Sequence, residues 1–237
     1  LNFTIIRGKI PIRSLDIAFM TDSKTGYIKI SRFAANTVDE YLEAFVKLKN
    51  QGLKNLILDL RGNPGGYLDA ATALADEFLP DDKLLVYTKG RSRQKIEHFA
   101  TKQGDFETGK LVVMIDEGSA SASEIVAGAV QDWDRATIVG RRSFGKGLVQ
   151  EQTVFPDGSA MRLTVARYYT PTGRSIQKSY ENGIEDYNND LENRFKQGEF
   201  KSVDSIHFAD DLKFKTPGGK IVYGGGGIMP DVFVPLD

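Results

Sequence analysis

The chain has 237 residues, 41% of them hydrophobic, which is enough to bury a continuous core in one large domain or two small ones. Its 31 basic and 32 acidic residues give a net charge of -1, so nothing in the overall charge favours a nucleic-acid or anionic-lipid partner. The absence of cysteine excludes disulfides, thiolate metal sites and thiol catalysis. No apolar run approaches the roughly 18 residues of a membrane-spanning helix.

The first 50 residues predict short antiparallel strands followed by a helix. Strands are expected at residues 3–6, 15–20 and 27–31. The segment Thr37-Val38-Asp39-Glu40 has the form of a capping box, and apolar residues follow it at helical spacing. A helix is therefore expected to run to about Asn50, before Gly52 stops it.

Strands and helices alternate from residue 55 onward. The near-continuous apolar segment 55–60 is typical of a strand buried on both faces, and it ends in the turn Arg61-Gly62-Asn63-Pro64-Gly65-Gly66. The next expected elements are a helix at 67–78, a hairpin at 84–88 and 94–99, a buried strand at 111–115, a helix at 122–133 and a strand at 136–139. This order predicts an α/β core with at least partly parallel strands.

The remainder of the chain is less regular. Residues 149–169 predict two strands around the turn Pro156-Asp157-Gly158, whereas 170–220 are polar and predict loop with a short helix before a last strand at 232–234. Lys89, Arg91, Arg93 and Lys95 alternate around the tip of the earlier hairpin, which favours a solvated strand face over a basic binding patch. With no internal repeat or linker, residues 1–237 are expected to form one domain, in which 170–237 is a C-terminal extension packed on the core.

One loop carries a candidate nucleophile. The segment Gly118-Ser119-Ala120-Ser121-Ala122-Ser123 lies between a buried strand and a helix, which brings a serine hydroxyl and several backbone N–H groups to a helix N-terminus. When the loop is taken alone, an ordinary serine-rich N-cap is favoured over a nucleophile. A nucleophilic serine would also need a base to accept its proton.

Lysine is a better candidate for that base than histidine. The chain has two histidines, and His98 in the charged hairpin and His207 in the polar tail are both expected at the surface. A lysine can act as a base when burial disfavours its charged form. Lys146 lies between glycines just beyond an apolar strand. About 12 helical residues carry the chain away from Ser121, and about seven extended residues can cover a similar distance back, so the two side chains can meet. If residues 146–150 are extended, Gln150 shares the face of Lys146 and could hold its amine.

Two other interpretations of these segments fail on their residues. Residues 140–146 match the first seven positions of a phosphate-binding P-loop, but Gly147 occupies the position of the required Ser or Thr, and a strand rather than a helix is expected next. A calcium loop at Asp186, Asn188 and Asp190 would have Leu191 in place of its glycine and Gln197 in place of its glutamate.

Three motifs, in order, resemble those of the carboxy-terminal processing peptidases, also called tail-specific proteases. They are Leu58-Asp59-Leu60-Arg61-Gly62-Asn63-Pro64-Gly65-Gly66, Ser119-Ala120-Ser121-Ala122-Ser123-Glu124-Ile125, and residues 140–147 with Gln150. The 25-residue gap between Ser121 and Lys146 also matches. The similarity covers at least residues 26–169, and Gly227-Ile228-Met229-Pro230-Asp231 resembles the family's closing motif.

The resemblance implies a serine endopeptidase with a Ser-Lys dyad, an acyl-enzyme and a crotonase/ClpP-like core of repeated strand-strand-helix units with additional antiparallel strands. Ser121 would attack, Lys146 would be the base and Gln150 would orient it, with no metal or cofactor. The oxyanion hole would use the backbone N–H of Ala122 and of either Gly65 or Gly66. Pro64 departs from the glycine or asparagine often found in that turn.

The resemblance also implies partners and a location. Family members normally carry a PDZ domain immediately before the strand at residues 3–6, and this chain is expected to lack it. The substrates would be polypeptides recognised near their C-termini, and the protein would be exported, periplasmic in a Gram-negative cell, with a homo-oligomer or an adaptor protein as further partner. The tail from about 174 to 220 resembles versions from Bacteroidetes-type bacteria.

Two alternatives to a peptidase remain open from sequence. One is a non-catalytic peptide-binding scaffold with the same core. The other is crotonase-like chemistry on acyl-coenzyme A, which rests on fold analogy and against which the Ser-Lys pair argues.

Overall fold

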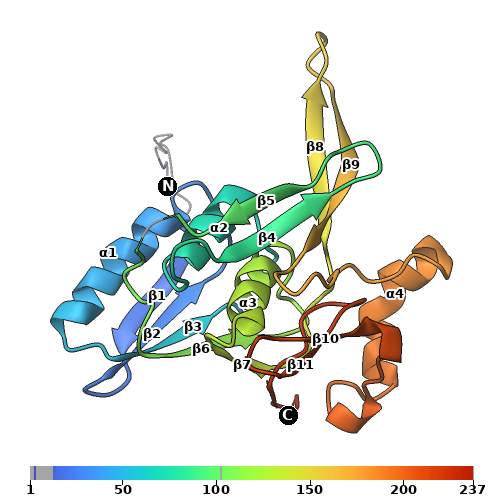
Figure 1. Ribbon diagram of the computed structural model, residues 1–237. Coiled ribbons are helices and arrows are strands. Elements are labelled where there is room, and N and C mark those ends of the chain that lie inside the picture. The colour runs from blue at the N-terminus through green and yellow to red at the C-terminus, as the bar shows by residue number, and fades with distance from the viewer. Residues whose placement is uncertain (1–2, 4–12, 102, 237) are drawn as a thin grey trace.

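The computed structural model describes Phe3 and residues 13–101 and 103–236 (Figure 1). The strand expected at residues 3–6 therefore falls almost wholly outside the described part. Within the described ranges, no helix is both long and apolar enough to cross a membrane.

A six-stranded sheet forms the base of the molecule, in the order β1-β2-β3-β6-β7-β12. The strand β1 is antiparallel to β2, and the other neighbouring pairs are parallel. The strands are β1 (Leu15–Met20), β2 (Thr25–Ile30), β3 (Asn55–Asp59), β6 (Lys110–Ile115), β7 (Thr137–Gly140) and β12 (Val232–Phe233). The apolar segments predicted as buried strands, β3 and β6, are neighbours in the middle of this sheet, as expected for strands covered on both faces.

Three helices pack beside this sheet, namely α1 (Thr37–Asn50), α2 (Leu68–Asp76) and α3 (Ala122–Asp132) (Figure 1). Every residue of α3 is buried, because α3 packs against α2, against β7 of the large sheet and against β4 (Leu84–Lys89) of a second sheet. A helix covered on all sides needs apolar or small residues all round, which explains its run of Ala, Val, Ile and Gly. The N-terminus of α3 is therefore held in a fixed position.

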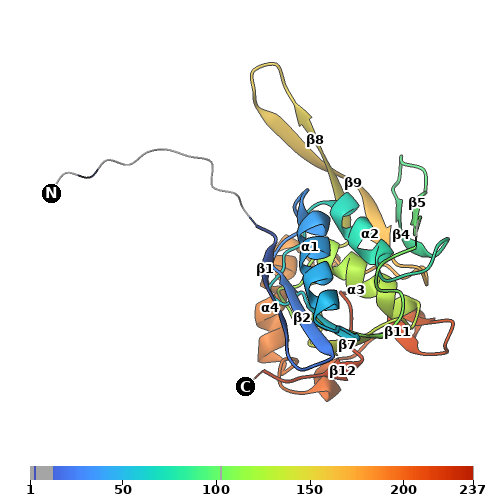
Figure 2. The same ribbon diagram turned by 90° about the vertical axis from the view of Figure 1, so that its left-hand side faces the viewer.

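The second sheet is antiparallel, in the order β5-β4-β9-β8. Its other strands are β5 (Ile96–Phe99), β8 (Leu148–Val154) and β9 (Ala160–Tyr169). The distal part of the β8–β9 hairpin extends well beyond the rest of the protein in both views (Figure 1 and Figure 2). The base of the hairpin, where β8 begins, follows the segment that carries Lys146.

The C-terminal extension is more structured than predicted. It holds a 14-residue helix, α4 (Gly183–Lys196), the 3-10 turns η1 (Val203–Ser205) and η2 (Asp210–Leu212), and a small sheet of β10 (Lys213–Lys215) and β11 (Ile221–Tyr223). The helix α4 buries only Arg194, although the apolar residues Ile184, Tyr187, Leu191 and Phe195 recur along it at helical spacing. Its one buried side chain is charged.

The expected capping box at the start of α1 is wrong. The helix begins at Thr37, its N-cap is Asn36, and the Asn36 side chain makes no capping bond. The carboxylate of Glu40 instead accepts the backbone N–H groups of Ser14 and Leu15, and the Thr37 hydroxyl accepts the N–H of Ala34. The Glu40 carboxylate therefore bonds to residues that are distant in the sequence instead of to the N-terminus of its own helix.

The mixed α/β architecture confirms the fold class predicted from the alternation of strands and helices. The finer crotonase/ClpP-like description stays a prediction.

Candidate active site

Ser121 lies at the N-terminus of α3 with an unusual backbone. Its φ of 55° and ψ of -111° place a non-glycine residue at positive φ, which costs on the order of 1–3 kcal/mol and requires support from its surroundings. Support comes from the side chain of Glu124, whose Oε2 accepts the Ser121 N–H at 2.8 Å, and from the backbone of Asn63, whose carbonyl accepts the Ala120 N–H at 2.9 Å. Strained residues held in this way cluster at functional sites.

The glycine turn after β3 packs directly against the serine loop. A Cβ at Gly65 would lie 2.6 Å from the Ala120 carbonyl oxygen and 2.8 Å from the Ala122 nitrogen, so no larger residue fits there. The buried Asn63 shapes the turn, because its side chain donates to the Ile30 carbonyl at 2.8 Å and accepts the Gly65 N–H at 2.9 Å.

The two candidate oxyanion glycines differ in what their N–H groups do. The Gly65 N–H is already bonded to Asn63, whereas no acceptor among the described residues takes the N–H of Gly66 or of Ala122. Gly66 has a φ of 155°, and a Cβ there would lie 1.8 Å from the Phe33 carbonyl oxygen. The turn therefore leaves one glycine N–H free, beside the free N–H at the start of α3.

Lys146 belongs to a segment without regular structure, residues 142–147, which we call the lysine loop. Its inner side is bonded to Glu124. One oxygen, Oε1, accepts the Ser143 hydroxyl at 2.5 Å and the Gly145 N–H at 2.7 Å, and the other, Oε2, accepts the Lys146 N–H at 2.9 Å. Because Oε2 also accepts the Ser121 N–H, a single carboxylate joins the serine loop to the lysine loop.

Glu124 is fully buried. Burial raises its pKa above the ordinary value, although the hydrogen bonds from Ser143, Lys146, Gly145 and Ser121 act in the opposite direction. The four donors are what make a buried carboxylate tolerable there.

The predicted site residues meet at one pocket of about 490 Å³. It is lined by Pro64, Gly65, Gly66, Tyr67, Ser121, Lys146, Leu148, Gln150, Gln152, Arg162 and Tyr168. Ala122, the remaining predicted residue, is next to Ser121 at the start of α3. No acidic side chain is among the lining residues, and no carboxylate of the described residues forms an ion pair with Lys146.

The proposed relation between Lys146 and Gln150 is only partly present. Both line the pocket, but the strand β8 begins at Leu148 and its register shifts between Val149 and Gln150, so strand alternation does not extend back to Lys146. Across the described residues, no hydrogen bond joins the Gln150 amide to Lys146. A regular strand was assumed where the chain has a loop and a bulge.

The other sequence candidates lie elsewhere. His98 is on β5 and His207 is exposed, and neither lines the pocket. The strand β8 follows Lys146 where a P-loop would have a helix. Asp186 and Asp190, proposed and rejected as calcium ligands, lie on α4, where Asp190 pairs with Lys178.

Several residues at or beside the pocket had no role in the sequence analysis. The most connected is Glu124, which lies behind the pocket, and its signal was the spacing Ser-x-x-Glu at the start of α3, which is typical of a residue that reaches back to its helix N-terminus. Tyr67 follows the glycine turn, whereas Arg162 and Tyr168 are on β9, so only the tertiary fold brings them to one pocket.

Comparisons with known proteins identify the family of the chain. Residues 24–187 match Peptidase family S41. The chain is 42% identical over 183 residues to a carboxy-terminal-processing protease of Bartonella bacilliformis, covering 75% of this chain and 41% of the relative. It is also 42% identical over 182 residues to a carboxyl-terminal-processing protease of Synechocystis sp., covering 75% of this chain and 42% of the relative.

A solved structure, the photosystem II D1 C-terminal processing protease, matches with a TM-score of 0.66 and 28% identity, over 97% of this chain and 50% of that one. The matched region thus spans half or less of each of these longer proteins. On the family match and the identity of its relatives, the chain belongs to Peptidase family S41.

Proposed function

We propose that this chain is the catalytic part of a serine endopeptidase that cleaves polypeptides near their C-termini through a dyad of Ser121 and Lys146. The observation that carries the proposal is that one pocket contains the strained Ser121, Lys146 and the glycine turn, with Glu124 bonded to the loops of both dyad residues. The substrate class follows the names of the relatives, which are carboxy-terminal-processing proteases.

In the proposed reaction, the Ser121 oxygen bonds to the carbonyl carbon of the substrate as its proton passes to the neutral Lys146 amine. The resulting oxyanion accepts hydrogen bonds from the N–H groups of Ala122 and Gly66, the two left without an acceptor. The C–N bond then breaks, and the leaving amine takes the proton from Lys146. Water hydrolyses the acyl-enzyme by the same path, and Gln150 orients the lysine.

Three features leave the Lys146 amine available to Ser121. The pocket has no acidic lining residue, the lysine forms no ion pair with the described residues, and its loop is bonded to Glu124 through backbone N–H groups rather than through the amine. A carboxylate beside the amine would favour its charged form and oppose its use as a base.

A fluorophosphonate label tests the proposal directly, because it reacts only with an activated serine. We expect labelling at Ser121 and peptide hydrolysis in the wild type, and loss of both in Ser121→Ala and in Lys146→Ala, since a nucleophile and its base act as one unit. His98→Ala should leave the rate of hydrolysis unchanged, because His98 does not line the pocket. Loss of hydrolysis in His98→Ala would overturn the assignment of Lys146.

The alternative is a non-catalytic peptide-binding scaffold. It is favoured by one observation, that no hydrogen bond joins the Ser121 hydroxyl to Lys146 in this substrate-free structure, although such bonds often tighten only with substrate. Peptide binding without labelling of Ser121 would support the scaffold. We further propose that the chain forms one domain and acts in an exported protein, with an oligomer or adaptor as partner.

A further inference from the structure

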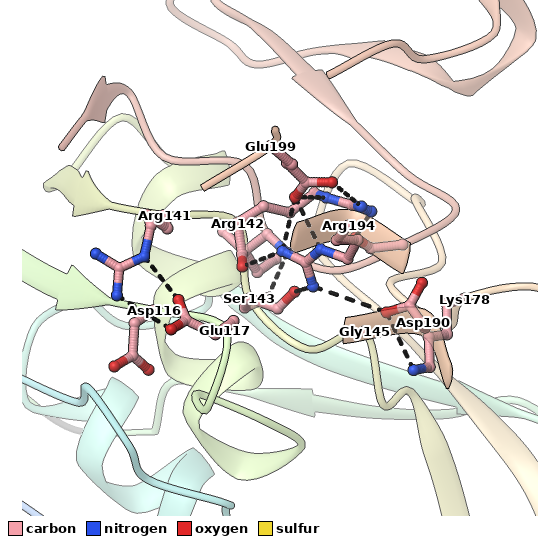
Figure 3. Close-up of polar contacts among 12 residues, drawn as sticks. Asp116, Glu117, Arg141, Arg142, Ser143, Gly145, Lys178, Asp190, Arg194 and Glu199 are labelled. Carbon is pink, nitrogen blue, oxygen red and sulfur yellow. Dashed lines mark hydrogen bonds and ion pairs between the residues drawn. The ribbon is translucent and has the colours of Figure 1, made fainter. Parts of the chain in front are cut away.

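The outer side of the lysine loop is bonded to the C-terminal extension through Arg194 of α4 (Figure 3). The Arg194 guanidinium donates to the backbone carbonyl of Arg142 at 2.7 Å and to that of Ser143 at 3.1 Å. It also binds Glu199, with its Nε 2.8 Å and its Nη2 2.7 Å from Oε1. Arg142 binds the same carboxylate at 2.8 and 2.6 Å, so Arg142, Arg194 and Glu199 form a closed network that we call the arginine clamp.

The clamp is costly as a stabilising device. The side chains of Arg194 and Glu199 are only 3% and 6% exposed, and moving such charges out of water costs several kcal/mol that the ion pair recovers only in part. Burial lowers the pKa of Arg194, and the charge of Arg142 lowers it further. Apolar side chains of similar size could fill this space without that cost. A guanidinium differs from them in that its planar fork can bind two successive backbone carbonyls.

The lysine loop needs such support because its own sequence does not rigidify it. It has no regular structure, and its Gly145 has a φ of 85°. Fixing the backbone of one residue costs about 1–2 kcal/mol in conformational entropy, which hydrogen bonds must offset. The inner N–H groups are bonded to Glu124, whereas the carbonyls of Arg142 and Ser143 are bonded to Arg194. The loop is thus held between α3 and α4.

A second contact from the extension reaches the middle of the same loop. The backbone N–H of Lys178 donates to the Gly145 carbonyl at 3.0 Å, and its Nζ lies 4.1 Å from the centre of the Phe144 ring. That Nζ is bonded to Asp190 at 3.2 Å, one turn before Arg194 on α4. Asp190 and Arg194 lie one turn apart on α4, and Figure 3 shows Arg194 at the lysine loop and Asp190 at Lys178.

We propose that Arg194 is a positioning residue for hydrolysis. The arginine clamp holds the backbone of the lysine loop so that the Lys146 amine meets the Ser121 hydroxyl, and α4 thereby sets the activity of the dyad. This inference rests on the proposed function.

The test compares Arg194→Lys with Arg174→Lys. Arg174 is the matched control because it is also a buried arginine of the extension, paired with Asp132 at 2.7 Å and bonded to the Tyr223 carbonyl. Its partner Asp132 is at the far end of α3, about 16 Å along the helix axis from Ser121. Among the described residues, the Arg174 side chain bonds to Asp132, Gln131 and Tyr223 and not to the lysine loop. Each substitution keeps the positive charge and removes the planar guanidinium that can bind two carbonyls at once.

We expect Arg194→Lys to lower kcat by roughly 10- to 100-fold, because small misplacements of a catalytic group can cost that much. KM should stay within about twofold of wild type. Arg174→Lys should leave kcat within about twofold of wild type, even where its melting temperature falls as far as that of Arg194→Lys. Equal losses of kcat in the two variants, or an unchanged kcat in Arg194→Lys, would overturn the proposal.

Amide hydrogen exchange over residues 141–148 separates this inference from the proposed function. Faster exchange there in Arg194→Lys, but not in Arg174→Lys, is the expected result, and it is measurable whether or not the protein hydrolyses peptides. If the wild type has no Ser121-dependent hydrolysis, the proposed function fails. Arg194 then has no catalytic group to position, even if hydrogen exchange shows that the arginine clamp orders the loop. If hydrolysis is present but exchange is equal in both variants, only the clamp fails.

Discussion

At the scale of single residues, Glu124 organises the candidate site more than either dyad member does. It is completely buried and accepts four hydrogen bonds, which come from the start of α3 and from the lysine loop. Each of its oxygens accepts two of these bonds. A neutral side chain could not satisfy the same four donors.

Glu124→Gln tests this role. The amide has one acceptor oxygen, and its NH₂ group would face N–H or O–H donors, which leaves buried donors unpaired at a cost of about 1–3 kcal/mol each. We expect kcat for peptide hydrolysis to fall roughly 100-fold through displacement of the loops. The control is Glu192→Gln, because Glu192 is 63% exposed on α4 and pairs only with Lys196. Wild-type kcat in Glu124→Gln would contradict the role assigned to this carboxylate.

At the scale of elements, the extension is attached to the core by buried ion pairs as well as by apolar side chains such as Ile176 and Ile228. Arg174 pairs with Asp132 of α3, and Glu199 pairs with Arg142 and Arg194. Burial alone would raise the pKa of Glu199, but the hydrogen bonds and charges of Arg142 and Arg194 outweigh it and lower that pKa below its ordinary value of 4.5. The docking of α4 therefore depends on an ionised Glu199.

The sign of the pH effect follows from that lowered pKa. Glu199 binds protons less readily in the folded than in the unfolded state, so it stabilises the fold above its ordinary pKa and that stabilisation is lost as pH falls through the lower folded value. Between about pH 5 and 3, the melting temperature of wild type should fall more steeply than that of Glu199→Gln. The exposed Glu181→Gln should follow the wild-type curve. Parallel curves for wild type and Glu199→Gln would contradict this.

At the scale of the whole molecule, one apolar cluster joins the large sheet, the helices and β4. It contains Leu58 of β3, Val126 of α3 and Val86 of β4, each at most 1% exposed. The serine loop and the glycine turn emerge from this cluster at the ends of β6 and β3, which are neighbours in the sheet. The rigidity of the core is thus transmitted to the pocket.

Leu58→Ala tests how much the central strand contributes. Leu58 is fully buried, so the lost burial and the resulting cavity should lower the free energy of unfolding by about 3 to 5 kcal/mol in denaturant titrations. Ile184 on α4 is 62% exposed, and Ile184→Ala should change the free energy by less than about 0.5 kcal/mol. A loss below about 1 kcal/mol for Leu58→Ala would mean that the core repacks around the cavity.

The sequence allowed the central elements and the dyad residues to be predicted because both have local signals. Apolar runs identified β3 and β6, and the segments with glycine and small residues after β6 and β7 identified the loops of Ser121 and Lys146. The prediction was wrong for the capping box of α1, where Glu40 bonds to Ser14 and Leu15, and incomplete for α4. In both places the decisive partners are distant in the chain.

By itself, the sequence determined the α/β class, the family motifs and the residue types of the candidate site, since hydrophobic periodicity, turns and short motifs act over a few residues. Only the tertiary structure decided which groups meet: Glu124 with both loops, the N–H of Gly65 with Asn63, and Arg194 with the carbonyls before Lys146. Hydrogen bonds between segments depend on distance and direction in space, which no local pattern of residues encodes.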